Sequence, residues 1–134
     1  MKRTKIRSKS DRQILLDECY SLIRKDLIHK RGPYCQICEK QASGRQLTLF
    51  HILPRGKYPK IQLYEDNLLL ACWFPCHRDW HHDFYKARVI QEKIKVLKGP
   101  DYETRLKVYD KGATKLSLFL IQAWLTSLKA QVGE

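Results

Sequence analysis

The sequence predicts an α+β domain with a small metal-braced core and helices on both sides of it. Two close cysteine pairs, Cys35/Cys38 and Cys72/Cys76, suit one tetrahedral zinc ion, and a β-prone run at residues 47–52 lies between them. Segments with helical periodicity precede and follow this region. We expect a basic flexible arm at residues 1–9 and a single domain at 10–134. Within it, the braced core should cover about 33–86 and the C-terminal helices about 87–132.

The chain is strongly basic. Its 134 residues hold 26 Lys and Arg against 14 Asp and Glu, a formal net charge of +12. Such an excess favours a polyanionic partner, of which nucleic acid is the commonest. No apolar run approaches the ~20 residues of a transmembrane helix, so we expect no membrane partner. Five cysteines without a signal peptide suit a reducing cytoplasm better than a secreted disulfide scaffold.

The N-terminal part predicts one amphipathic helix over about residues 11–29. Ser10 and Gln13 form a capping box at its start, and Gly32-Pro33 ends it. Cys19 falls on its apolar face, where a cysteine behaves as a small buried hydrophobic residue.

The middle of the chain is predicted to form two short strands joined by a long loop. A tight knuckle at 34–40 precedes the first strand at 47–52, and residues 67–71 can pair with it as the second. The loop at 53–66 is interrupted by Pro54, Gly56 and Pro59, and loops of this length inside a domain are usually functional. A helix should begin near Cys76 and carry the histidines that follow.

The C-terminal third predicts three helices, at about 87–97, 102–110 and 114–132. One face of the last helix should hold Leu116, Leu120, Ala123, Trp124 and Leu128. These helices are expected to serve packing and docking rather than chemistry.

The four paired cysteines predict a structural zinc site. Short spacing lets one turn present two sulfurs to the same ion, and two such pairs complete a tetrahedron. A site closed by four thiolates leaves no open position for substrate, so this ion would support the fold. Four buried, reduced cysteines without metal are the alternative interpretation.

A second metal site is indicated by His77 and His81. Four residues apart on a helix, their imidazoles share one face and can bind one divalent ion, whereas His82 points elsewhere.

The order of these residues resembles the His-Asn-His (HNH) endonucleases of the ββα-metal fold. The resemblance rests on Cys35-x-x-Cys38, His51-Ile52-x-x-Arg55, Asn67 and Cys72-x-x-x-Cys76 with the helical segment after it. More narrowly, the chain looks like the NinG/Rap recombination nucleases of lambdoid phages. That likeness implies an endonuclease for branched recombination intermediates such as Holliday junctions and D-loops. It also implies host-cell cytoplasm as its place, and a homodimer is possible.

The resemblance also implies a role for each matching residue. His51 would be the general base that activates water, and Asn67 would hold the loop or the base ring. His77 would hold the catalytic metal, with His81 as its second ligand. Basic residues of the loop and of the helix that follows are expected to contact DNA: Arg55, Lys57, Lys60 and Arg78.

One position departs from the family pattern. Many HNH nucleases carry a metal-binding Asp directly before the base histidine, and here Phe50 stands at that place. The ion would then depend on imidazoles and on a more distant carboxylate such as Asp79 or Asp83. Nitrogen ligands favour Mn²⁺, Ni²⁺ or Zn²⁺ over Mg²⁺, although Mg²⁺ stays a candidate. Two alternatives remain open: a non-catalytic zinc module that binds nucleic acid, and a homing or restriction-type HNH enzyme that cuts duplex DNA.

Overall fold

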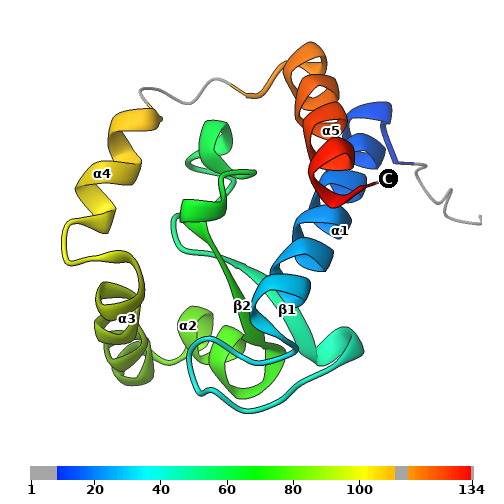
Figure 1. The fold of residues 1–134 in the computed structure, drawn as a ribbon. Helices are drawn as coiled ribbons and strands as arrows, with labels where there is room; N and C mark the ends of the chain where they lie inside the picture. The colour runs from blue at the N-terminus through cyan, green and yellow to red at the C-terminus, as the bar shows by residue number, and fades with distance from the viewer. Residues whose placement is uncertain (1–8, 111–114, 134) are drawn as a thin grey trace, which may run out of the picture.

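The computed structural model describes residues 9–110 and 115–133. Nearly all of the expected basic arm therefore lies outside the described residues. The long elements, in chain order, are α1 (Asp11–Arg31), β1 (Leu47–His51), β2 (Leu68–Cys72), α2 (Arg78–His82), α3 (Phe84–Lys98), α4 (Tyr102–Tyr109) and α5 (Leu118–Val132) (Figure 1).

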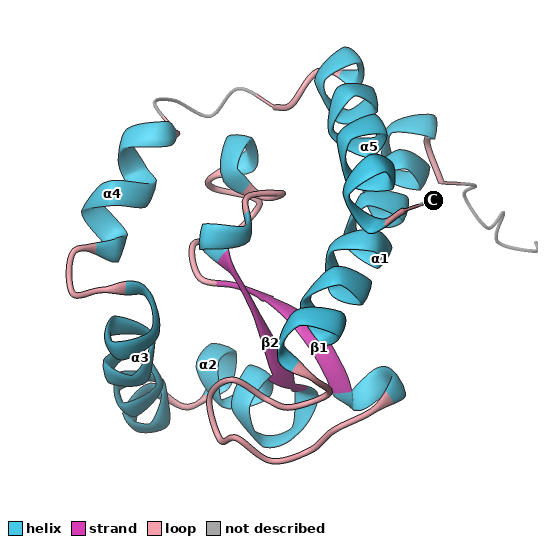
Figure 2. Cartoon of the chain, in the orientation of Figure 1, coloured by secondary structure: helices cyan, strands magenta, loops and turns pink. Residues whose placement is uncertain are grey.

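The two strands form an antiparallel hairpin in the middle of the molecule, with helices on both sides (Figure 2). Leu47 pairs with Cys72 and His51 with Leu68. Every residue of β2 is buried, because both faces of the hairpin are covered. Leu68 and Leu70 join the hydrophobic cluster made with α1 and α5, whereas the cluster on the other face lies against α3 and α4. Burial on two faces compensates for the small size of a two-stranded sheet.

Helices α1 and α5 pack side by side and run in the same direction (Figure 1). The Cys19 thiol lies 3.9 Å from the Ile121 carbonyl oxygen near the start of this contact. Near its end, the Gln131 amide donates to the Asp26 carboxylate at 3.2 Å. Cys19 is fully buried, as expected, and its burial, together with the nearby Glu18, raises its pKa to about 11. A thiol in that state is an unreactive packing group.

The buried face of helix α5 matches the expected one in part. Leu128 is buried and Trp124 packs against the core, and Leu116 just before the helix is buried too. The buried positions of α5 are Ile121, Leu125 and Leu128, whereas Leu120 and Ala123 are exposed. The helix begins only at Leu118, because the Ser117 hydroxyl caps it by accepting from the Leu120 backbone N–H at 3.2 Å. Packing against α1 then selects the buried stripe.

The other elements lie close to their expected places. Ser10 caps α1 by accepting from the Gln13 N–H at 3.2 Å, but the Gln13 side chain binds Asp17 instead of completing the capping box. The long loop contains two short 3₁₀ turns, Pro59–Ile61 and Glu65–Asn67. A π-type turn, Trp73–His77, leads from β2 into α2.

The fold class expected from the sequence is confirmed: an α+β arrangement with a hairpin, a four-cysteine cluster and flanking helices. Within the described ranges 9–110 and 115–133, none of the helices combines the length and the apolar character that a bilayer span requires.

Candidate functional site

The four cysteines meet at one point. Their sulfur atoms all lie within 4.8 Å of one another, and the sulfurs of Cys38 and Cys72 are 3.8 Å apart. Four sulfurs at ~2.3 Å around a tetrahedral zinc ion are ~3.8 Å from each other. The cluster therefore fits a structural zinc ion, as the spacing predicted.

Backbone hydrogen bonds shape the first cysteine pair. The Cys38 N–H donates to the Cys35 sulfur at 3.4 Å, and the Cys35 N–H donates to the Lys40 carbonyl at 2.9 Å. Gln36 ties this knuckle to β2, since its N–H donates to the Leu70 carbonyl and its side-chain oxygen accepts from the Leu70 N–H, both at 2.8 Å. These hydrogen bonds hold the first cysteine pair against β2, the strand that ends in Cys72.

Burial disfavours the thiolate form at this cluster. It raises the pKa of Cys72 to about 11, and it also raises the pKa of Cys76, to which the neighbouring Cys35 adds. A bound dication offsets this cost because it takes thiolates as ligands. The cluster is therefore chemically suited to a metal ion.

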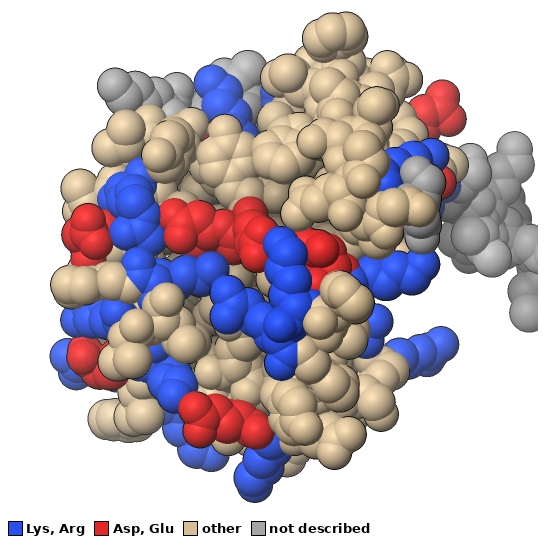
Figure 3. Space-filling model, in the orientation of Figure 1, with Lys and Arg blue, Asp and Glu red and all other residues tan. Residues whose placement is uncertain are grey.

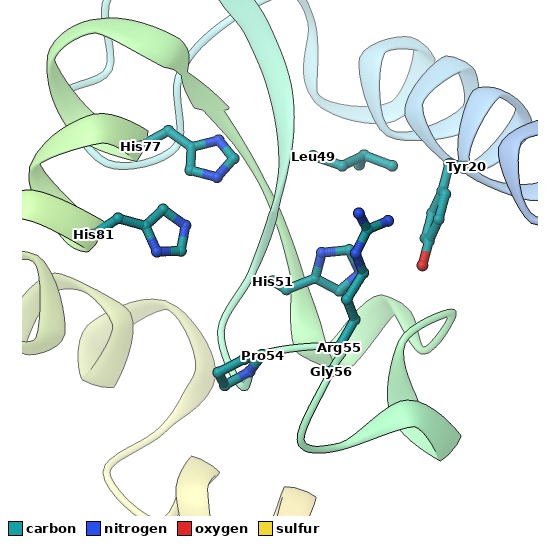
Figure 4. Close-up of a pocket in the computed structure, with 8 residues that line it drawn as sticks. All are labelled: Tyr20, Leu49, His51, Pro54, Arg55, Gly56, His77 and His81. Carbon is teal, nitrogen blue, oxygen red and sulfur yellow. The ribbon is translucent and has the colours of Figure 1, made fainter. Parts of the chain in front are cut away.

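A second site lies on the other end of β1, in a pocket of about 450 Å³. It brings together His51, His77 and His81 from β1, the π-type turn and α2 (Figure 4). The pocket is also lined by Tyr20, Leu49, Pro54, Arg55 and Gly56. Chain segments far apart in sequence thus place three imidazoles around one space.

The His51 ring is fixed by a backbone carbonyl. Its Nε2 lies 3.0 Å from the Gln62 carbonyl oxygen, which can only accept, so Nε2 carries the proton of the neutral ring and Nδ1 carries none. Burial lowers the pKa of His51 to about 4, with the charges of Arg55 and His77 acting in the same direction. The imidazole is therefore neutral at physiological pH, with one nitrogen ready to accept a proton.

Tyr20 of α1 supports the same segment, a role that the sequence did not reveal. Its hydroxyl donates to the Gln62 side-chain oxygen at 2.6 Å, and the Gln62 amide donates to the Pro59 carbonyl at 2.9 Å. The Tyr20 ring also meets the His51 ring edge-on, with centroids 5.5 Å apart (Figure 4). These contacts hold Gln62, and through it the His51 ring, in place.

Thr48 determines which ring nitrogen of His77 carries the proton. The Thr48 hydroxyl donates its hydrogen to the Ala71 carbonyl at 2.8 Å, so toward His77 it can only accept. Nδ1 of His77 lies 2.7 Å from that hydroxyl and must therefore be its donor. The other ring nitrogen, Nε2, is left with a free lone pair, which is the form that binds a metal. Burial, with the His81 charge adding to it, lowers the pKa of His77 to about 4.

His81 lies beside His77 and is open to solvent. The two ring centroids are 5.2 Å apart and the planes are inclined by 36°, so both rings face the same region (Figure 4). The His82 ring is 6.4 Å from His81 and does not line the pocket. The helical spacing thus gives the pair that the sequence indicated.

Asn67 is fully buried beneath the loop that follows β1. Its side-chain oxygen accepts from the Leu53 N–H at 2.8 Å, and its amide donates to the Leu53 carbonyl at 3.1 Å and to the Ile61 carbonyl at 3.5 Å. It therefore holds the loop backbone, and the His51 ring is held separately by Gln62.

Residues 35–83 match the family model described as HNH endonuclease. The chain carries an HNH endonuclease domain. The match includes both cysteine pairs and all three pocket histidines. HNH domains are phosphodiester hydrolases that use a divalent metal on DNA, so this protein is an enzyme of that class. Searches of curated proteins and of solved structures found no match to the chain.

Phe50 occupies the place in this HNH domain where a carboxylate was expected. Its ring is fully buried, 5.3 Å from the His77 ring and 5.2 Å from the Trp80 ring. Of the two more distant carboxylates, Asp79 lies 3.8 Å from the Lys86 ammonium and Asp83 caps α3 by accepting from the Lys86 N–H at 3.0 Å. Among the described residues, only the four cysteines form a group of three or more acidic, His or Cys side chains close enough for one ion.

The four basic residues expected to contact DNA differ in their surroundings. Arg55 is exposed and lines the pocket, and Lys57 is exposed with its ammonium 6.0 Å from the centre of the Tyr58 ring. Lys60 is half-buried in the 3₁₀ turn, and Arg78 is exposed at the start of α2. Arg55 is thus the residue of this group that borders the three imidazoles.

Replacing Thr48 by Val is expected to leave the neutral His77 ring without a preferred tautomer. Val keeps the shape and the β propensity of Thr but offers no hydroxyl, so Nδ1 and Nε2 of His77 then share the proton. We expect ¹⁵N NMR of the histidine side chains to change from one tautomer to a mixture, and divalent-ion affinity to fall about 10-fold or more. Thr48→Ser is the control, since it keeps the hydroxyl and should keep the tautomer. A single unchanged tautomer in Thr48→Val would contradict this assignment.

Proposed function

We propose that the HNH domain hydrolyses DNA with His51 as general base and with His77 and His81 as ligands of the catalytic ion. The observation that carries the proposal is the convergence of three imidazoles in one pocket, two of them with proton positions fixed by separate hydrogen bonds. A single backbone carbonyl and a single threonine thus prepare one ring for a proton and the other for a metal.

In the proposed reaction, Nδ1 of His51 takes a proton from the attacking water. The hydrogen bond from Nε2 to the Gln62 carbonyl then stabilises the imidazolium that forms. When bound, a divalent ion would stabilise the charge on the scissile phosphate and on the 3′ oxygen that leaves as the P–O3′ bond breaks. His77 would hold that ion through Nε2, and His81 would supply the second nitrogen. This donor set suits Mn²⁺, Ni²⁺ or Zn²⁺ better than Mg²⁺.

Basic side chains near the pocket are proposed to hold the DNA backbone. Arg55 borders the imidazoles and offers a planar, two-pronged donor to a phosphate next to the scissile one. Lys57, Lys60 and Arg78 add positive charge along the loop and at the start of α2.

We further propose branched recombination intermediates, such as Holliday junctions and D-loops, as the substrate. The resemblance to the NinG/Rap nucleases of lambdoid phages supports this choice, and it also supports a phage-encoded enzyme acting in the host-cell cytoplasm. A homodimer would let two sites cut a junction symmetrically. The outer side of α5 supports self-association, because Phe119 and Leu120 are exposed there. Sedimentation at micromolar concentration would test that part.

We also propose that residues 10–134 form one domain, with the arm at 1–9 as an extension. The hairpin contributes to both hydrophobic clusters, so the helices before and after the braced core share the same two strands.

Cleavage assays decide the function. Zinc-loaded protein is incubated with supercoiled plasmid and with a four-way junction, with Mn²⁺ or Mg²⁺ added or with no added ion. We expect cutting that depends on the added ion, that EDTA abolishes and that excess Mn²⁺ restores, with the junction cut in preference to linear duplex. Site-specific cutting of duplex would indicate a homing or restriction-type enzyme instead.

A second candidate is favoured by the buried Phe50 ring, which stands where a metal-binding carboxylate was expected. Without that ligand, the domain could bind nucleic acid through its charge and keep only its zinc brace. Binding of the junction without cutting under Mn²⁺, Mg²⁺, Ni²⁺ or Zn²⁺ would select this alternative.

Removing the basic arm should weaken DNA binding. Residues 1–9 contain five Lys or Arg, and the slope of log K against log salt becomes shallower by about 0.9 for each phosphate that the protein no longer neutralises. We expect residues 10–134 alone to bind several-fold more weakly at low salt and with a shallower slope. Lys107→Gln serves as control, because this lysine is paired with Glu103 at 2.8 Å. Unchanged affinity and slope would show that the arm does not touch the DNA.

A further inference from the structure

Four exposed aromatic side chains fall within residues 73–85, two before α2 in the chain and two after it. Trp73 is 45% exposed, Phe74 58%, Phe84 72% and Tyr85 80%. Aromatic rings contribute most when their large apolar area is buried, so this segment leaves much apolar surface in water. Such a group of exposed rings indicates a binding surface.

An arginine lies over the ring of two of these residues, Phe74 and Phe84. The Arg78 guanidinium carbon lies 5.6 Å from the centre of the Phe74 ring, and that of Arg88 lies 5.7 Å from the centre of the Phe84 ring. The same pairing thus occurs before and after the pocket histidine His81. Each pair offers a flat apolar face next to a cation, which is the combination that single-stranded nucleic acid requires.

Trp73 connects this surface to the pocket. Its ring centroid is 5.2 Å from that of His77, and His77 is 5.2 Å from His81. A flat, partly exposed indole therefore adjoins His77, one of the two imidazoles proposed to hold the catalytic ion. A base stacked on Trp73 would belong to a nucleotide close to the scissile phosphate.

We propose that these side chains form a stacking surface for unpaired bases of the DNA substrate. The surface consists of Trp73, Phe74, Arg78, Phe84, Tyr85 and Arg88. The inference rests on the proposed nuclease function and extends it, since it names what the enzyme reads beside the backbone. Bases in an intact duplex are already stacked and paired, whereas a single strand, such as the displaced strand of a D-loop, offers free ones.

The arginines favour nucleic acid over a protein partner. The outer side of α5 gives the contrast, because Phe119 is 77% exposed there and Lys129 is the one charged residue between Leu118 and Val132. Figure 3 shows few charged side chains over α5, while Lys and Arg, interspersed with Asp and Glu, spread over the part of this face that covers α3 and α4. A partner that meets rings and cations together is an aromatic polyanion, and a single DNA strand has that chemistry.

A strand without bases separates stacking from charge. Binding of a fluorescent single-stranded oligonucleotide is compared with binding of an abasic strand with the same number of phosphates. Zinc-loaded protein is used with no other divalent ion, so that binding is measured apart from cleavage. We expect Trp73→Ala and Phe84→Ala each to bind the base-containing strand at least about 5-fold more weakly and to bind the abasic strand as tightly as the parent does. Arg78→Gln should lower the affinity for both strands and make binding less dependent on salt.

Tyr109→Ala is the matched control, because it removes a 55% exposed ring that belongs neither to this surface nor to the pocket, and it should change the affinity for neither strand. Zinc content and far-UV circular dichroism exclude misfolding of Trp73→Ala, and Phe84→Ala tests the surface independently of the brace. The proposal is overturned if both aromatic variants bind the oligonucleotide like the parent, or if they lose as much affinity for the abasic strand. It is also overturned if they change only the oligomeric state, which would indicate a protein-docking face. If base-dependent binding is present but no ion supports cleavage, the stacking surface stands and the nuclease function fails.

Discussion

Replacing Cys72 by Ser removes the zinc ion and with it the folded core. Cys72 is the last residue of β2, where it pairs with Leu47 and supplies one of the four clustered sulfurs. Two five-residue strands are too short to be stable without support. Structural zinc contributes about 10–16 kcal/mol in small zinc domains, which equals or exceeds the ~5–15 kcal/mol that stabilises a typical domain.

The measurements are zinc content by elemental analysis and thermal unfolding followed by circular dichroism. We expect less than stoichiometric zinc and no cooperative transition in Cys72→Ser, and the same result for Cys35→Ser. Cys19→Ala is the control: this thiol is buried outside the cluster, so the variant should lose some stability but keep its zinc. A cooperatively folded Cys72→Ser protein without zinc would refute a structural role for the ion.

Replacing His51 by Ala is expected to reduce cleavage by about 10²–10⁴-fold, the usual contribution of a general base. Zinc content and junction affinity should stay close to those of the parent, because the ring makes one hydrogen bond, to Gln62, and lies outside the cysteine cluster. His82→Ala is the matched control, since His82 lies outside the pocket and should be dispensable. Full activity in His51→Ala would show that another group accepts the proton.

The same residue gives a pH prediction. Burial disfavours the charged ring and lowers the pKa of His51 to about 4, compared with ~6.5 for a histidine in the unfolded chain. The base therefore stays neutral as the pH falls through 6, and cleavage should decline only near pH 4–5. Between about 6.5 and 4 the unfolded state binds more protons than the folded one, so the free energy of unfolding should also fall as the pH falls. An activity loss centred near pH 6.5 would mean that the ring is solvated in the working enzyme.

Features set by local spacing could be predicted from the sequence. Each cysteine pair is brought together by a single turn, and the four sulfurs lie close together as expected. One helical turn separates His77 from His81, and their rings lie side by side. The roles of the histidines in catalysis stay a prediction. Elements other than α5 begin and end within a few residues of their expected positions, because caps and glycines mark them.

The supporting residues could not be predicted, since their partners are backbone atoms brought close by the fold. The proton of His77 depends on Thr48 meeting the Ala71 carbonyl, which follows from the register of β1 and β2. His51 is oriented by the carbonyl of Gln62, and any residue at that position has a carbonyl. Strand alternation was the one available signal, because it places Thr48 on the same side of β1 as Phe50. The burial of Ile121 and Leu125 in α5 was missed because it depends on contact with α1.

The pairing of β1 with β2 makes the zinc site and the histidine pocket depend on the same folding step. Strand β2 ends in Cys72, one of the four clustered cysteines. The carbonyl of the residue before it, Ala71, accepts from the Thr48 hydroxyl, and this sets which nitrogen of His77, the proposed metal ligand, carries the proton. A chain that has not paired these strands therefore has neither the brace nor the prepared imidazole. Chains that have not folded, or that lack zinc, are therefore expected to be unable to cut DNA.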